Sequence, residues 1–116
     1  MAGFIDGSLI LDSTAFTTAS GNNNDIPVAG SLMYIIVSNN NDAITGITPD
    51  ANLGYLIFVV NVGPTNNLVI KNNSSSSAAG NRIISYSGSD VTVAPLQTAL
   101  LGYDTTNQEW HIIKFA

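Results

Sequence analysis

The chain has 116 residues, enough for one domain with a modest hydrophobic core. Three lysines and arginines against eight acids give a net charge of −5, which excludes the basic patch that binding to nucleic acid or an anionic membrane requires. There is no cysteine, so disulfides and thiolate metal sites are excluded, and charged residues make up only 9% of the chain.

The first 24 residues are predicted to form an N-terminal arm or a pair of first strands, ahead of a domain at residues 25–116. The turn cluster Gly21–Asn24 separates the two parts, since Gly and Asn tolerate left-handed backbone conformations. The arm carries more large apolar side chains than a solvated tail would, so we expect it to anchor the protein to a partner. The expected anchoring residues are Phe4, Ile5, Leu9, Ile10, Leu11 and Phe16.

The N-terminus lacks the basic start and the continuous apolar stretch of a signal peptide. We expect the chain to be complete from Met1.

From Ile26 onward, short apolar segments alternate with turn residues. The expected strands cover residues 26–28, 31–38, 43–47, 54–62, 67–71, 82–86, 90–94, 97–103 and 109–115. Strands every ~8–12 residues, with turn residues between them, predict an all-β fold of the antiparallel β-sandwich or jelly-roll-like type. No window shows a helical period with caps.

The longest apolar run covers residues 54–62, GYLIFVVNV. It is shorter than the ~20 residues of a membrane helix, and its aromatic and β-branched content predicts a strand. Both faces of this strand are apolar, as are those of residues 31–38. Such strands are central in a sandwich or covered by a neighbouring subunit. The expected subunit interface includes Met33, Ile35, Tyr55, Ile57 and Val59.

Groups for catalysis are sparse. His111 is the only histidine, it follows Trp110 on a predicted strand, and no partner residues of a catalytic triad are evident. The carboxylates fall at predicted turns and strand starts, where Asp bonds nearby backbone amides, and none has the spacing of a calcium loop. We predict no enzymatic activity and no catalytic, cofactor or metal site. A calcium ion shared between turns is the alternative left open.

The remaining polar and aromatic residues are predicted to be structural. The run Ser74–Ser77 lies between two strands and favours a solvated loop over a contact loop. Tyr103 and Trp110 are expected to pack across paired strands, with stacking on sugar rings, together with Tyr86, as the alternative.

Arg82 is one of three strong cations and lies within a strand pattern. We expect it to be structural and to pair with a turn carboxylate such as Asp90 or Asp104, because breaking a partly buried ion pair leaves the other charge unpaired.

The second half of the chain carries an ordered set of short motifs. They are G-x-x-I-x-x-x-N-V-G from Gly54 to Gly63, L-x-I-x-N from Leu68 to Asn72, a Ser/Ala loop followed by Asn81-Arg82, D-V-T-V-A-P from Asp90 to Pro95, and L-x-Y-D before Trp110. In this order they resemble β-rich modules of tailed-phage virion proteins, including tail fibres, head fibres and small capsid-associated proteins. The resemblance implies a virion structural role and a homotrimer, and it identifies no catalytic residue.

The expected function is therefore that of a capsid decoration (cement) protein. Such a protein is made in the host cytoplasm and lies on the capsid exterior as a homotrimer bound to the major capsid protein, with no nucleic acid, membrane or cofactor partner. A chain starting at Met1 and too short for a shaft favours this role. The alternative is a tail-fibre or receptor-binding tip that recognises host glycans. A bacterial lectin-like module fits the motif order less well.

Overall fold

The computed structural model describes residues 3–5, 8–28, 30–49, 54 and 56–115. Strands make up 48% of the chain and helix 3%, which confirms the all-β prediction. The predicted antiparallel β-sandwich or jelly roll is wrong, because the strands wind into the stacked coils of a β-solenoid.

The elements follow one another closely along the chain. In order they are β1 (Gly3–Ile5), β2 (Ser8–Ile10), β3 (Ser13–Thr17), β4 (Asn22–Asn23), β5 (Ile26–Pro27), β6 (Leu32–Ile36), β7 (Asp42–Ile44), β8 (Ile47–Thr48), β9 (Leu56–Asn61), β10 (Leu68–Ile70), the 3-10 turn η1 (Ala79–Asn81), β11 (Ile83–Ile84), β12 (Val91–Val93), β13 (Thr98–Asp104) and β14 (Glu109–Phe115).

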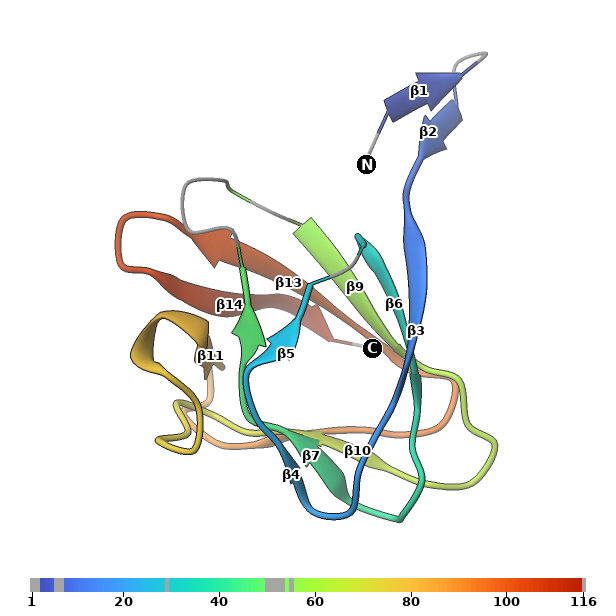
Figure 1. The fold of residues 1–116 in the computed structure, drawn as a ribbon, viewed down its shortest axis with the longest axis vertical. Coiled ribbons are helices and arrows are strands. Elements are labelled where there is room, and N and C mark those ends of the chain that lie inside the picture. Colours follow the sequence, from blue (N-terminus) through green and yellow to red (C-terminus); the bar gives the residue numbers. More distant parts are fainter. Residues whose placement is uncertain (1–2, 6–7, 29, 50–53, 55, 116) are drawn as a thin grey trace.

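Successive coils place equivalent strands side by side and parallel. The first coil consists of β3, β4 and β5, the second of β6, β7 and β8, and the third begins with β9 and β10. Accordingly β3 pairs with β6 and β6 with β9, while β4 pairs with β7, β7 with β10, and β5 with β8, all in parallel. Figure 1 shows β3, β6 and β9 side by side, with β4, β7 and β10 together beyond the bend.

The chain then reverses and closes one end of the stack. Strand β12 runs antiparallel to β10, and β13 runs antiparallel to β9. Strand β14 forms a hairpin with β13 and takes β11 as a parallel neighbour. The result is a six-stranded sheet, β11-β14-β13-β9-β6-β3, and a four-stranded sheet, β12-β10-β7-β4.

The core lies inside the coils and follows the alternation of each strand. Met33 on β6, Val59 on β9 and Ala99 on β13 form one buried row across the six-stranded sheet. The four-stranded sheet and the β5–β8 pair supply further buried apolar residues, including Ile44 on β7 and Ile47 on β8. Because each buried aliphatic side chain contributes ~1.5–3 kcal/mol, this shared core holds successive coils together.

Polar side chains fasten the bend between the six-stranded and four-stranded sheets. Asp42 is 2% exposed and accepts hydrogen bonds from the Thr18 hydroxyl at 2.7 Å and from the backbone amides of Asn39 and Gly21 at 2.9 and 3.0 Å. Since Thr18 and Gly21 belong to the first coil and Asn39 to the second, this one carboxylate links two coils.

Asn61 performs the same task in the third coil. It is fully buried, its amide nitrogen donates to the carbonyls of Asn66 and Val93 at 2.9 and 2.8 Å, and its oxygen accepts from the amide of Gly63 at 2.9 Å. In the part of the chain that the structure describes, no buried side-chain nitrogen or oxygen atom lacks a hydrogen-bond partner. Buried Asn, Ser and Thr side chains such as Thr18 and Asn61 therefore satisfy backbone and side-chain groups at these bends.

A second bend, between the four-stranded sheet and β5–β8, is built on hydroxyls. Thr45 and Ser77 are both buried and their hydroxyl oxygens lie 2.7 Å apart, while Ser77 also accepts from the amide of Asp25 at 3.0 Å. A Cβ on Gly46 would lie 2.5 Å from Ser77 Cβ, so only glycine fits there. The predicted solvated loop at Ser74–Ser77 is thus wrong for Ser77, because its hydroxyl joins three coils.

The structure divides the predicted N-terminal segment, residues 1–24, into two parts. Strands β1 and β2 form a hairpin that stands away from the solenoid body (Figure 1). Strands β3 and β4 instead build the first coil, in the register Ser13↔Leu32 to Thr17↔Ile36 for β3. The solenoid therefore begins at Ser13, and residue 25 lies within its first coil.

Candidate functional site

The N-terminal hairpin is the first candidate surface. Within the described strands, β1 and β2 pair only with each other, with Phe4 opposite Leu9. Of the expected anchoring residues, Phe4, Ile5, Leu9 and Ile10 lie on this hairpin. Leu11 is half-buried where the hairpin joins the body. Phe16 belongs to the solenoid instead, because its partly buried ring packs against the core.

The outer surface of the six-stranded sheet is the second candidate, and we call it the outer apolar face. It consists of Leu32, Tyr34, Ile36, Leu56, Phe58, Val60, Leu100 and Ile113. Leu32, Phe58 and Leu100 form one row across three strands. A Cβ on Gly102 would lie 2.7 Å from Ile113 Cδ1 and 3.7 Å from Leu56 Cδ2, so Leu56 and Ile113 close over this glycine.

The interface predicted from the two-faced strands uses the opposite set of positions. Met33, Ile35, Ile57 and Val59 are at most 1% exposed and lie inside the solenoid, where the same chain covers them. Tyr55 lies outside the described residues. The sequence showed two apolar faces but not which face turns inward. The inner face also includes Asn61, whose amide the structure buries at a bend.

The third candidate is a cluster of side chains at the β13–β14 hairpin, which we call the hairpin cluster. Asp104 ends β13 and is paired in register with Glu109, which begins β14, and His111 follows two positions later on the same face. His111 Nε2 lies 3.3 Å from Asp104 Oδ2 and 3.1 Å from Glu109 Oε2. The three side chains are 26–42% exposed, so solvent reaches the cluster.

The turn that joins the two strands holds the Asp104 carboxylate in place. Asp104 Oδ1 accepts from the backbone amides of Thr106 and Asn107 at 2.9 and 3.1 Å, and Oδ2 accepts from Asn107 Nδ2 at 2.8 Å. The backbone and side-chain hydrogen bonds from Asn107, the largest causes, hold the pKa of Asp104 below its ordinary value of 3.8. The carboxylate is therefore charged near neutral pH and points at His111.

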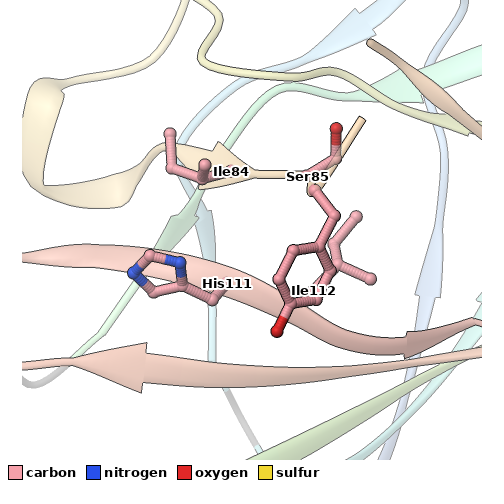
Figure 2. Close-up of a pocket in the computed structure, with 5 residues that line it drawn as sticks. Ile84, Ser85, His111 and Ile112 are labelled. Atoms are coloured by element: carbon pink, nitrogen blue, oxygen red, sulfur yellow. The ribbon is translucent and has the colours of Figure 1, made fainter. Parts of the chain in front are cut away.

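A small pocket lies beside the hairpin cluster, between β11 and β14. It has a volume of about 50 Å³ and is lined by Ile84, Ser85, Tyr86, His111 and Ile112. Figure 2 shows the side chains that line it, with the His111 ring at one side. The volume is far below the ~300–1,000 Å³ of typical small-molecule sites, although it is large enough for a water molecule. Tyr86, at 93% exposure, makes the rim an aromatic contact surface.

The aromatic residues expected to pack across paired strands are neighbours in the core. The rings of Tyr103 and Trp110 lie 5.0 Å apart at 64°, an edge-to-face contact. Trp110 Nε1 donates to the carbonyl of Ile47 at 2.8 Å, and the Tyr103 hydroxyl donates to the carbonyl of Gly80 at 3.0 Å. Both polar tips thus bind backbone of the coils they cover.

The carboxylates expected to pair with Arg82 have other partners. Asp90 pairs with Lys71 at 3.2 Å, and Asp104 faces His111. Arg82 Nε donates to the carbonyl of Ser77 at 3.1 Å. The pairing prediction failed because solenoid winding places Arg82 beside the loop that precedes it in the chain.

The sequence prediction did not place Glu109 in any site. The available signal was the spacing of Asp104, Glu109 and His111, because a hairpin between the two carboxylates brings all three side chains to one face. Those carboxylates had been assigned to turns and strand starts one by one, without the pairing that joins them.

Comparisons with known proteins add no family to these observations. No protein-family model matches the chain, and no curated protein or solved structure matches it significantly. Within the described residues, no helix has the length and apolar character needed to cross a membrane.

Proposed function

We propose that the protein is a structural component of a phage virion, a capsid decoration protein held on the head exterior by its N-terminal hairpin. The observation that carries this proposal is the hairpin itself, whose strands pair with nothing else among the described strands and which stands away from the body (Figure 1). Its apolar sequence fits contact with a partner, and the ordered motifs of residues 54–110 resemble those of phage virion proteins.

Strand addition supplies the attachment energy. Both outer edges of the β1–β2 hairpin are unpaired in the described structure, so either can extend a sheet of the major capsid protein. Backbone hydrogen bonds and burial of large apolar groups, at ~1.5–3 kcal/mol each, offset an ordering cost of ~1–2 kcal/mol per residue. Three copies in a trimer raise the avidity without a tight single contact.

The outer apolar face is the surface on which copies associate in this proposal. Leu56, Ile113 and Ile36 are 57%, 48% and 43% exposed, large apolar side chains that lie on one face of the sheet. Interfaces between identical subunits are enriched in such apolar groups and avoid buried charge. A closed trimer covers this face in all copies.

A truncated chain that begins at Leu11, and so lacks β1 and β2, tests the anchoring role of the N-terminal hairpin. The truncated chain keeps every strand of the solenoid, whereas a truncation at residue 25 would remove β3 and β4. Phage shells lacking the protein are mixed with the full chain, the truncated chain, a Phe4→Ser/Leu9→Ser variant and a Ser8→Ala control, and bound protein is measured by sedimentation. We expect the truncated chain and the double variant to stay folded and oligomeric but to lose shell binding, and the control to bind normally. Binding by the truncated chain at full strength would overturn the anchoring role.

A tail-fibre tip that contacts host glycans is the second candidate, and one observation favours it. Tyr86 is 93% exposed at the rim of the pocket beside His111, and exposed aromatic rings stack on sugars. Under this alternative, the protein binds bacterial surface polysaccharide, and Tyr86→Ala abolishes the binding while truncation at Leu11 leaves it intact.

A further inference from the structure

We propose that Asp104, Glu109 and His111 form a binding site for a divalent transition-metal ion, with Zn²⁺ the preferred ion. The site is separate from the N-terminal hairpin and the proposed anchoring role. It lies in the half of the six-stranded sheet away from β3, where the β13–β14 hairpin turns.

The spacing of the ligand atoms fits one ion. Zn²⁺ binds His nitrogen and carboxylate oxygen at ~2.0–2.2 Å in a tetrahedron, which separates neighbouring ligand atoms by ~3.3–3.5 Å. His111 Nε2 lies 3.3 Å from Asp104 Oδ2 and 3.1 Å from Glu109 Oε2. One ligand atom from each of the three residues lies within 4.8 Å of the others, close enough for a single ion to contact all three.

The scaffold holds these ligands in advance. Asp104 is fixed by two backbone amides of the turn, through the oxygen that does not face His111. Glu109 and His111 project from the same face of a strand that is paired on both sides, with β13 and β11. Ligands on regular strands keep their geometry better than ligands on loops, so little ordering accompanies binding.

The ligand set selects the kind of ion. Calcium and magnesium take oxygen ligands in larger numbers, whereas an imidazole with two carboxylates suits zinc and its transition-metal neighbours. Three protein ligands leave a fourth position for water, and the 42% exposure of the His111 side chain keeps that position open. The calcium site considered from the sequence is therefore not the one proposed.

The competing state is a protonated His111 held between two carboxylates, with no metal. A proton and a metal ion compete for the same Nε2 atom, because only neutral imidazole binds a metal. Added zinc binds His111 in the metal site but has no such ligand if His111 is only an ion-pair partner. The composition of the chain makes these two states easy to distinguish. With one histidine and no cysteine, any signal from an imidazole comes from His111 and no thiolate binds the added metal.

The experiment measures zinc binding to the untagged full chain by isothermal titration calorimetry near neutral pH, with ¹⁵N spectra of the imidazole recorded in parallel. The variants are His111→Gln, Glu109→Gln and Asp104→Asn, and the control is Asp90→Asn, which removes an equal charge at the Lys71 pair. Circular dichroism establishes that each variant is folded. Cobalt(II) absorption reports the coordination geometry.

We expect one zinc ion per chain, a large shift of His111 Nε2 on zinc addition, and tetrahedral cobalt absorption. Each ligand variant should weaken binding by at least the ~10–100-fold that loss of a mere outer-shell partner costs, while the control binds as the parent does. Absence of saturable binding, an unshifted His111 resonance, or equal binding by the ligand variants and the control would each overturn the site. In those cases His111 acts only as an ion-pair partner of the two carboxylates.

Discussion

At the scale of single residues, Asp42 connects the coils most directly. Its carboxylate is 2% exposed and accepts hydrogen bonds from Thr18, Gly21 and Asn39, which belong to two coils. Because each buried donor left unpaired costs ~1–3 kcal/mol, we expect Asp42→Ala to lower the free energy of unfolding by about 3 kcal/mol or more. Urea denaturation measures the change. Asp90→Ala, at an exposed ion pair worth at most ~1 kcal/mol, is the control. Equal losses in the two variants would contradict the role of Asp42.

The same residue gives the protein a pH dependence with a definite sign. Burial alone would raise the pKa of Asp42, but hydrogen bonds from Thr18, Asn39 and Gly21 outweigh burial and hold the pKa below its ordinary 3.8. A lowered folded-state pKa contributes stability that is complete above the unfolded value and is lost as pH falls through the folded value. We therefore expect the urea midpoint to hold from neutral pH to ~5 and to fall at lower pH.

The measurement is a series of urea denaturations of the parent and of Asp42→Asn. The hydrogen bonds that lower the pKa values of Asp25, Asp90 and Asp104 add to the acid sensitivity, so the variant should keep part of it. An Asp42→Asn profile as steep as that of the parent would show that Asp42 does not contribute.

At the scale of elements, the outer apolar face makes a prediction about oligomers. Leu56→Glu and Ile113→Lys place charges on exposed positions of β9 and β14, so the fold should survive while association between copies is lost. The control is Leu96→Glu, at an 80% exposed apolar residue between β12 and β13 that lies outside the face. Sedimentation equilibrium measures the mass. An unchanged mass for the two face variants would place the subunit contact elsewhere.

The strands themselves were largely predictable from the sequence, and their pairing was not. The run predicted at residues 54–62 is β9 at Leu56–Asn61, and the run at 109–115 is β14. Alternation and turn residues mark where a strand lies, but they do not say whether its partner is the next strand or the strand one coil later. The equivalent strands β3, β6 and β9 start 19 and 24 residues apart, which leaves enough chain for a parallel connection. Strands that follow one another directly in the chain are close enough to form hairpins, so the spacing alone fits both pairings.

The polar bends and the hairpin cluster escaped prediction for a related reason. Asn61 and Ser77 look like turn or loop residues in the sequence, and only the stacking of coils reveals that their side chains are buried and bonded. Asp104, Glu109 and His111 come together through the register of one hairpin. An error of one residue in that register would send alternate side chains to opposite faces.

At the scale of the whole molecule, the local stability against opening should fall from the middle of the stack of coils toward the N-terminal hairpin. Strand β9 is paired on both sides, β3 is an edge strand, and β1–β2 lies outside the solenoid sheets. Because repeat architectures are stabilised by contacts between neighbouring repeats, amide hydrogen exchange should be slowest in β9, faster in β3 and fastest in the hairpin. Nuclear magnetic resonance measures these rates. Equal amide protection in the N-terminal hairpin, β3 and β9 would contradict this gradient.

The reversal of the chain after the third coil makes the height of the stack adjustable. The N-terminal hairpin β1–β2 leads into the six-stranded sheet at β3, and the hairpin cluster lies toward the opposite edge of that sheet. The coils between them therefore act as spacers. Each further coil inserted between Pro27 and Leu32 would add one strand spacing, about 4.8 Å, without altering the chemistry at either end. In the proposed role, the number of coils would set the distance between the N-terminal hairpin and the hairpin cluster.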